Sequence, residues 1–168
     1  LYNAGEAMLT GDKELAYKVI SRERRVNAFE LKIDSDCEDI IALYAPVAID
    51  LRFVLAMYKI NTNLERLGDF AESIARFAGN LPEGEPIDPQ LVKETRVEEM
   101  LSELLSMISL TKEAFEKESS EIASRIFLKD NLIDEINHNS TAIIAKYIEE
   151  HKGSALAGLY MAGVIRKM

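Results

Sequence analysis

Two pairs of acidic side chains have a spacing that could hold a cation. Glu30 and Asp34 are four residues apart, and so are Glu65 and Asp69. Four residues is just over one turn of an α-helix, so the two carboxylates of a pair project from one face of a helix. Glu30 also lies beside the apolar stripe of its helix, near the seam that this helix would share with a neighbour. If the two helices pack antiparallel, we expect the four carboxylates to converge.

Converging carboxylates require either protons or a bound cation. Two like charges about 4 Å apart repel by about 1 kcal/mol in water and about 4 kcal/mol near a protein surface. Oxygen ligands suit hard or borderline ions such as Mg²⁺, Mn²⁺ or iron. Asp130 and Asp134 repeat the spacing in the second half of the chain. The alternative stays open, because acids four residues apart are common in acidic helical proteins and usually form a solvated face.

Few other residues could carry chemistry. Glu135 and His138 have the Glu-x-x-His spacing of di-iron carboxylate bundles, but only one copy is present and such sites need two. We therefore interpret His138 as a surface or structural histidine. Cys37 lies on an apolar stripe, which indicates a core residue. No phosphate-binding loop, nucleotide fingerprint or nucleophile–base arrangement occurs, so we predict that the protein is not an enzyme and has no catalytic residues.

The composition limits the partners. The 168 residues include 29 acidic and 20 basic side chains, and the net charge of −9 argues against nucleic-acid binding. It favours cations, basic protein surfaces or other helices. A single cysteine excludes an internal disulfide framework and is typical of a reducing compartment. No apolar run reaches the length of a bilayer span, so we expect no direct membrane insertion.

The apolar pattern predicts an all-α fold. Apolar residues recur every three or four positions from residue 12 to 44, which is typical of one long amphipathic helix. Pro46 ends that helix and fits the first turn of a second, which runs to about residue 78. Three of the four prolines lie in residues 79–89, which we interpret as a linker. A third long helix follows, with apolar residues from Val97 to Phe115 on one face. A fourth has apolar residues from Ile122 to Tyr147, and a last helix starts after Gly153 and Ser154.

The two halves of the chain also echo each other. Ile40–Tyr44 and Ile143–Tyr147 are similar apolar runs, each followed by a breaker and another helix. Because helices joined by short turns pack antiparallel, we predict two tandem three-helix bundles. We assign residues 1–80 to the first repeat, 81–90 to the linker and 91–168 to the second repeat. The first and last helices look incomplete, so we expect a piece of a longer protein.

The segments Ala45–Arg52 and Lys59–Asp69 stand out as a candidate family motif. Together they closely resemble the signature of the PhoU family. The upstream residues Val26–Glu30 are similar to the preceding helix of that family. In the second half, Asp134–Ile136 and Val164–Met168 resemble a weaker second repeat. The resemblance therefore spans nearly the whole chain.

The resemblance implies a fold and a role. PhoU-like proteins consist of two three-helix bundles, as the pattern predicts here. They are cytoplasmic negative regulators of phosphate uptake and of the phosphate-starvation response. They contact the ATPase subunit of the phosphate transporter and the phosphate-sensing histidine kinase. By resemblance we expect these partners, together with a homo-oligomer such as a dimer.

The resemblance also implies metal binding. Some PhoU-like proteins bind multinuclear metal clusters through acid-x-x-x-Asp pairs. Carried over by position, the ligands are Glu30, Asp34, Glu65 and Asp69 in a first cluster, and Asp130 and Asp134 in a second, whose partner pair is absent here. The expected cofactors are metal ions, with iron, zinc, manganese and magnesium all open.

Three other interpretations stay open. The same domain could form the cytosolic tail of a sodium–phosphate cotransporter, in which membrane spans precede it. A di-metal carboxylate enzyme would require a second Glu-x-x-His and redox-active iron. A purely structural helical adapter would leave its acid pairs empty.

Overall fold

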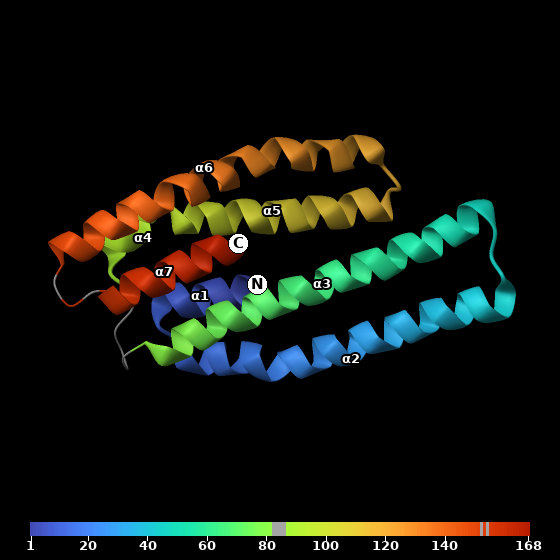
Figure 1. Ribbon diagram of the computed structural model, residues 1–168, viewed down its shortest axis with the longest axis horizontal. Coiled ribbons are helices and arrows are strands. Elements are labelled where there is room, and N and C mark those ends of the chain that lie inside the picture. Colours follow the sequence, from blue (N-terminus) through green and yellow to red (C-terminus); the bar gives the residue numbers. More distant parts are fainter. Residues whose placement is uncertain (82–86, 152, 154) are drawn as a thin grey trace.

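The computed structural model describes residues 1–81, 87–151, 153 and 155–168 (Figure 1). Over these residues the chain forms seven α-helices and no strand, which confirms the predicted all-α fold. The helices are α1 (Tyr2–Thr10), α2 (Lys13–Tyr44), α3 (Ala48–Asn80), α4 (Pro89–Thr95), α5 (Val97–Glu116), α6 (Ser120–Glu150) and α7 (Ala155–Lys167).

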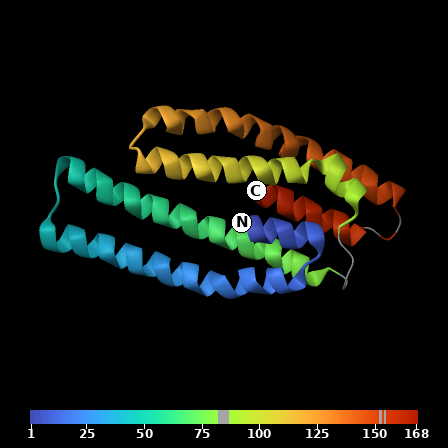
Figure 2. The same cartoon turned by 180° about the vertical axis from the view of Figure 1, so that it is seen from behind.

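Helices α2 and α3 form a long antiparallel hairpin along one side of the molecule (Figures 1 and 2). The start of α2 is capped by Asp12, whose carboxylate accepts a hydrogen bond from the backbone N–H of Leu15 at 2.9 Å. Such a cap satisfies one of the amide groups that have no partner within the first turn of a helix. The hairpin therefore begins at a defined residue.

The connection between α2 and α3 differs from the prediction. Ala45 adopts the left-handed conformation with a φ of 44°, and α3 begins only at Ala48, after the N-cap residue Val47. Pro46 lies in this connection, so its predicted location in the first turn of the second helix is wrong. The physical reason is that an antiparallel reversal needs residues outside both helices, and Pro46, which has no N–H to donate, serves there.

The apolar face predicted for the third helix, from Val97 to Phe115, lies in α5, and a short helix that was not predicted precedes it. The short helix α4 begins where the Asp88 carboxylate accepts a hydrogen bond from the N–H of Gln90 at 2.8 Å. It ends at Arg96, which has a φ of 54° and also starts α5. The Arg96 guanidinium contacts Glu99 at 2.7 Å and Glu135 at 2.8 Å. No glycine or proline occurs at the break between α4 and α5. Of the predicted linker, residues 82–86 lie outside the described residues.

Helices α5 and α6 form a second hairpin beside the first, and α7 packs against α6 and α3 (Figures 1 and 2). The core lies where both hairpins meet α1, α4 and α7. This end of the molecule, called its base below, is opposite the α2–α3 connection (Figure 1). Its largest fully buried apolar side chains are Met8, Ile74, Leu91, Met100, Met161 and Ile165. They come from α1, α3, α4, α5 and α7, so both halves of the chain contribute to one core.

The far half of the α2–α3 hairpin exposes apolar side chains. On the apolar stripe predicted for α2, Cys37 is buried, but Phe29 is 51% exposed and Tyr44 is 76% exposed. The short helix α1 reaches only the base of the hairpin (Figure 1). Two helices alone cover only part of each other's apolar stripe. Within the described residues, no helix has the length and apolarity needed to cross a membrane.

Candidate functional site

A row of polar side chains follows the seam between α2 and α3. We define the acidic seam as Glu23, Asn27, Glu30 and Asp34 from α2, with Asn61, Glu65 and Asp69 from α3. On each helix these residues are spaced by three or four positions, which puts them on one face. Because the two helices are antiparallel neighbours, the two faces meet.

Asn61 joins the two helices at this seam. Its side chain is buried, with 5% of its surface exposed. Its Nδ2 donates one hydrogen bond to the backbone oxygen of Glu30 at 2.9 Å and another to Oδ1 of Asp34 at 2.7 Å. Both amide hydrogens of a residue on α3 are thus used on α2. This bridge holds the register of the hairpin and the orientation of the Asp34 carboxylate.

Glu65 is surrounded by other acids. Burial raises the pKa of its carboxyl above the ordinary value, and the negative charges of Asp69, Glu30 and Glu23 raise it further, as does a hydrogen bond with Asp69. Each of these causes disfavours the ionised form. Two other residues predicted for the first metal cluster, Asp69 and Glu30, therefore lie within electrostatic reach of Glu65.

The seam also contains an oxygen without a partner. The side-chain Oδ1 of Asn27 is buried and accepts no hydrogen bond, which is uncommon in native proteins. In donor chemistry, carboxylates together with an amide oxygen suit a hard cation. In geometry, no three His, Cys, Asp or Glu side chains among the described residues are grouped closely enough to hold a metal ion.

The structure therefore brings the first predicted set together without forming a coordination shell. Asp34 is held by Asn61, whereas Glu65 is electrostatically coupled to Asp69 and Glu30. A cation at this seam would require some of these side chains to change rotamer. Metal binding at the first set stays a prediction.

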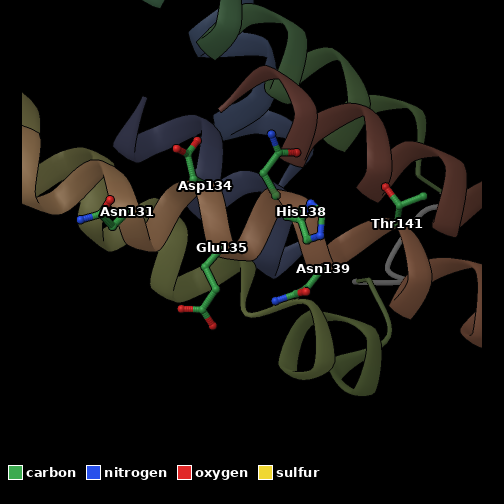
Figure 3. A pocket seen from close by; sticks show the side chains of 7 residues that line it. Asn131, Asp134, Glu135, His138, Asn139 and Thr141 are labelled. Atoms are coloured by element: carbon green, nitrogen blue, oxygen red, sulfur yellow. The ribbon is translucent and has the colours of Figure 1, made fainter.

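The second predicted pair lies on α6, away from the acidic seam. Asp130 and Asp134 are both exposed. Asp134 lines an open polar hollow of about 710 Å³ whose lining residues, His138 among them, all belong to α6 (Figure 3). Asp134 and Glu135 point in different directions in Figure 3, and Glu135 pairs with Arg96. His138 is exposed, as predicted for a surface histidine. Metal binding by this pair also stays a prediction.

Cys37 is a core residue, as predicted. Burial raises the pKa of its thiol, and the charges of Asp34 and Asp36 raise it further. Since the thiolate is the reactive form, this environment lowers the reactivity of the thiol.

The acidic spacing alone does not identify the two amide residues of the seam, Asn27 and Asn61. Asn61 precedes Glu65 by four positions, and Asn27 follows Glu23 by four. That spacing puts each amide on the same helix face as an acid, and it was the signal that could have identified them.

The chain is similar to one family along both halves. A family model described as the PhoU domain matches residues 1–78 and 97–168. A PhoU homolog from Aquifex aeolicus (strain VF5), a phosphate-specific transport system accessory protein, is 33% identical over 165 residues, which cover 97% of this chain and 72% of that protein. The accessory protein PhoU of Escherichia coli (strain K12) is 31% identical over 171 residues, covering 100% of this chain and 69% of that protein.

Solved structures agree with these sequence relatives. The crystal structure of PhoU from Pseudomonas aeruginosa superimposes with a TM-score of 0.86 at 25% identity, covering 99% of this chain and 78% of that one. The crystal structure of the phosphate transport system regulatory protein PhoU from Streptococcus pneumoniae gives a TM-score of 0.82 at 27% identity, covering 99% of this chain and 77% of that one. The helical order, the signature residues and these matches lead to one conclusion: the chain belongs to the PhoU family.

Proposed function

We propose that this chain is an accessory protein of a phosphate transport system, and that it restrains phosphate uptake and the phosphate-starvation response through contacts with other proteins. The observation that carries the proposal is the PhoU-domain match over both halves. The relatives from Aquifex aeolicus and Escherichia coli are named as phosphate-specific transport system accessory proteins. These names support a PhoU-type role in phosphate transport.

Regulation by contact fits the physical character of the molecule. A rigid helical scaffold with a net charge of −9 offers an acidic surface to basic partners. The proposed partners are the ATPase subunit of the transporter and the phosphate-sensing histidine kinase, met in the cytoplasm. Such a regulator needs no reactive group, because it works through the difference in affinity that its partners have for it in two states.

The test is a pull-down of the transporter ATPase subunit and the sensor kinase with the full-length protein, with and without phosphate. We expect capture of at least one partner and a change in the captured amount between the two conditions. The control bait is the same protein after heat denaturation. Failure to capture either partner in both conditions would contradict the proposal.

We also propose that the acidic seam takes up a divalent cation through Glu65, Asp69 and Glu30. Support comes from the raised pKa of Glu65 among three other acids and from the unpartnered oxygen of Asn27. A bound cation would reduce the repulsion between the carboxylates and would give the Asn27 oxygen a partner. The chain's own contribution is to hold these oxygens along one helix seam.

Titration calorimetry with Mn²⁺ tests the cation proposal. The double variant E65Q/D69N is expected to weaken binding by about tenfold or more, because two charged donors are removed. The variant E149Q/E150Q removes the same charge from an exposed part of α6 and should leave binding unchanged. A third variant, D130N/D134N, measures the contribution of the second pair. Equal affinities for the E65Q/D69N and E149Q/E150Q variants would contradict the assignment of the seam.

A further inference from the structure

A cleft opens between α3 and α7, where the two halves of the chain meet. Its volume is about 290 Å³, close to the lower limit of about 300 Å³ for small-ligand pockets. We define the α3–α7 cleft by the lining residues that matter here, Ser73, Arg76, Phe77, Tyr160, Gly163 and Lys167. It shares no residue with the acidic seam, and its Arg76 is within electrostatic reach of Glu23 of that seam.

The charge of this cleft is opposite to that of the whole molecule. The chain has a net charge of −9, yet the lining of the cleft includes Arg76 and Lys167 and no acidic residue. Lys167 donates to Oγ of Ser73 at 2.7 Å. Among the described residues it has no carboxylate within ion-pair distance. An ammonium group has three N–H donors, so two remain for a ligand.

Arg76 supplies the second cation. One guanidinium nitrogen, Nη2, is paired with Glu72 at 2.6 Å. A guanidinium has five N–H donors in a planar fork, so donors remain beyond the pair with Glu72, while Glu23 also lies within electrostatic reach of Arg76. Glu72 itself does not line the cleft. Lys167, Arg76 and Ser73 therefore line the same small space.

The remaining wall is aromatic. The rings of Phe77 and Tyr160 lie with centroids 4.9 Å apart and an interplanar angle of 43°. Phe77 comes from α3 and Tyr160 from α7, so this pair also joins the two halves. Aromatic faces and edges bind flat apolar groups favourably. The cleft thus combines an anion-binding side with a side for a planar apolar group.

We propose that the α3–α7 cleft binds a small aromatic phosphate monoester, with the phosphate on Lys167 and Arg76 and the planar group against Phe77 and Tyr160. The three terminal oxygens of such a phosphate can accept hydrogen bonds from Lys167, which has no carboxylate partner among the described residues, and from the remaining donors of Arg76, whereas a carboxylate offers two oxygens. The proposal does not depend on the regulatory role, because binding to the cleft is measured on the protein alone.

Gly163 offers a variant that closes the cleft without disturbing the fold. It lies within α7 and lines the cleft, and a Cβ added there meets no atom within 4 Å. The substitution Gly163→Leu should therefore fill the cleft while improving helix propensity. Gly79→Leu is the matched control, because Gly79 is also in open space but does not line the cleft. Circular dichroism and thermal unfolding check that both variants are folded.

The experiment is titration calorimetry of the full chain with phenyl phosphate, with inorganic phosphate, benzoate and phenol as comparison probes. We expect phenyl phosphate to bind the unmodified protein and Gly79→Leu alike, and to lose binding to Gly163→Leu. Lys167→Gln should weaken binding by about tenfold or more. Lys112→Gln, which changes an exposed lysine on α5, should leave it unchanged.

The comparison probes decide which part of the proposal holds. Weaker binding of all three comparison probes supports the proposal. Inorganic phosphate lacks the aromatic ring, benzoate has a single negative charge, and phenol has none. Inorganic phosphate binding as tightly as phenyl phosphate would overturn the aromatic half, and benzoate or phenol doing so would overturn the phosphate half. Undetectable binding of phenyl phosphate at millimolar concentration, or binding unaffected by Gly163→Leu, would overturn the site.

Discussion

The seam between α2 and α3 contains polar side chains where two amphipathic helices would ordinarily bury apolar ones. Asn61 is satisfied there, because it donates to Glu30 and Asp34 across the seam. The carboxylate of Glu65 is in an unfavourable place, because burial and three neighbouring acids disfavour its negative charge. At the residue scale, the same row of side chains therefore holds a stabilising bridge and a destabilising charge.

Replacement of Glu65 by Gln should stabilise the protein at neutral pH. A carboxyl whose pKa is raised on folding destabilises the folded state above that raised pKa, and the penalty disappears below the unfolded value of about 4.3. We expect E65Q to have a higher urea midpoint than the unmodified protein at pH 7.5, with the difference shrinking towards pH 4. The control E149Q removes the same charge from an exposed part of α6 and should leave the urea midpoint at pH 7.5 unchanged. A lower midpoint for E65Q at pH 7.5 would contradict the raised pKa.

Asn61→Ala should be clearly destabilising. It removes two hydrogen bonds of a buried side chain and leaves Asp34 without its donor, which we expect to lower the free energy of unfolding by about 1–3 kcal/mol. Asn63, two residues along, is exposed and bonds only to Lys59 of its own helix. Asn63→Ala should change stability by less than about 0.5 kcal/mol. Urea unfolding at constant pH measures both, and equal effects would argue against an interhelical bridge.

At the scale of elements, the two halves are joined by close helix contacts. Gly5 of α1 faces Leu101 of α5, and a Cβ on Gly5 would lie 2.1 Å from Cδ2 of that leucine. Both residues are buried. The glycine is therefore needed for the approach of α1 to α5, since any larger side chain would have to displace a packed neighbour.

Gly5→Ala should lower the free energy of unfolding by about 1–3 kcal/mol through overpacking. The matched variant Gly79→Ala, in a helix with open space at the Cβ position, should raise it by about 0.5–1 kcal/mol. In a double-mutant cycle, the cost of Gly5→Ala should shrink when Leu101 is replaced by Ala, because the clash is then removed. Denaturant unfolding of the four proteins checks this, and strictly additive effects would contradict the proposed contact.

At the scale of the whole molecule, both halves share one core, whereas the far part of the α2–α3 hairpin has an exposed apolar surface. Buried residues of α1 and α3 lie in the same cluster as those of α6 and α7. Neither half can unfold without exposing the apolar surface of the other. The hairpin far from this core has fewer buried contacts to stabilise it.

The protein should therefore unfold in one main transition. Calorimetric and van't Hoff enthalpies are expected to agree, since the shared core couples both halves. In hydrogen exchange, amides near Ile74 in the core should be the most protected, and those near Tyr44 at the exposed end of the hairpin should exchange faster. Two separated thermal transitions, one for each half, would contradict the shared core.

Much of the secondary structure could be predicted from the sequence, because helix periodicity is local information. The apolar spacing from residue 12 to 44 predicted a helix that matches α2 (Lys13–Tyr44) closely. The break at Arg96 could not be predicted in this way. Arg96 adopts the left-handed conformation and forms ion pairs with Glu99 and with Glu135 on another helix. The spacing of apolar residues does not indicate such ion pairs.

The sequence by itself determined the all-helical class, and it put Glu30 with Asp34 and Glu65 with Asp69 on shared helix faces. Only the tertiary structure decided that Asn61 binds Asp34, that acids crowd Glu65, and that Arg76 and Lys167 line one cleft. The physical reason is one of range. The face of a helix on which a residue lies depends on neighbours three or four positions away, whereas its distance from a residue on another helix depends on how every side chain between them packs.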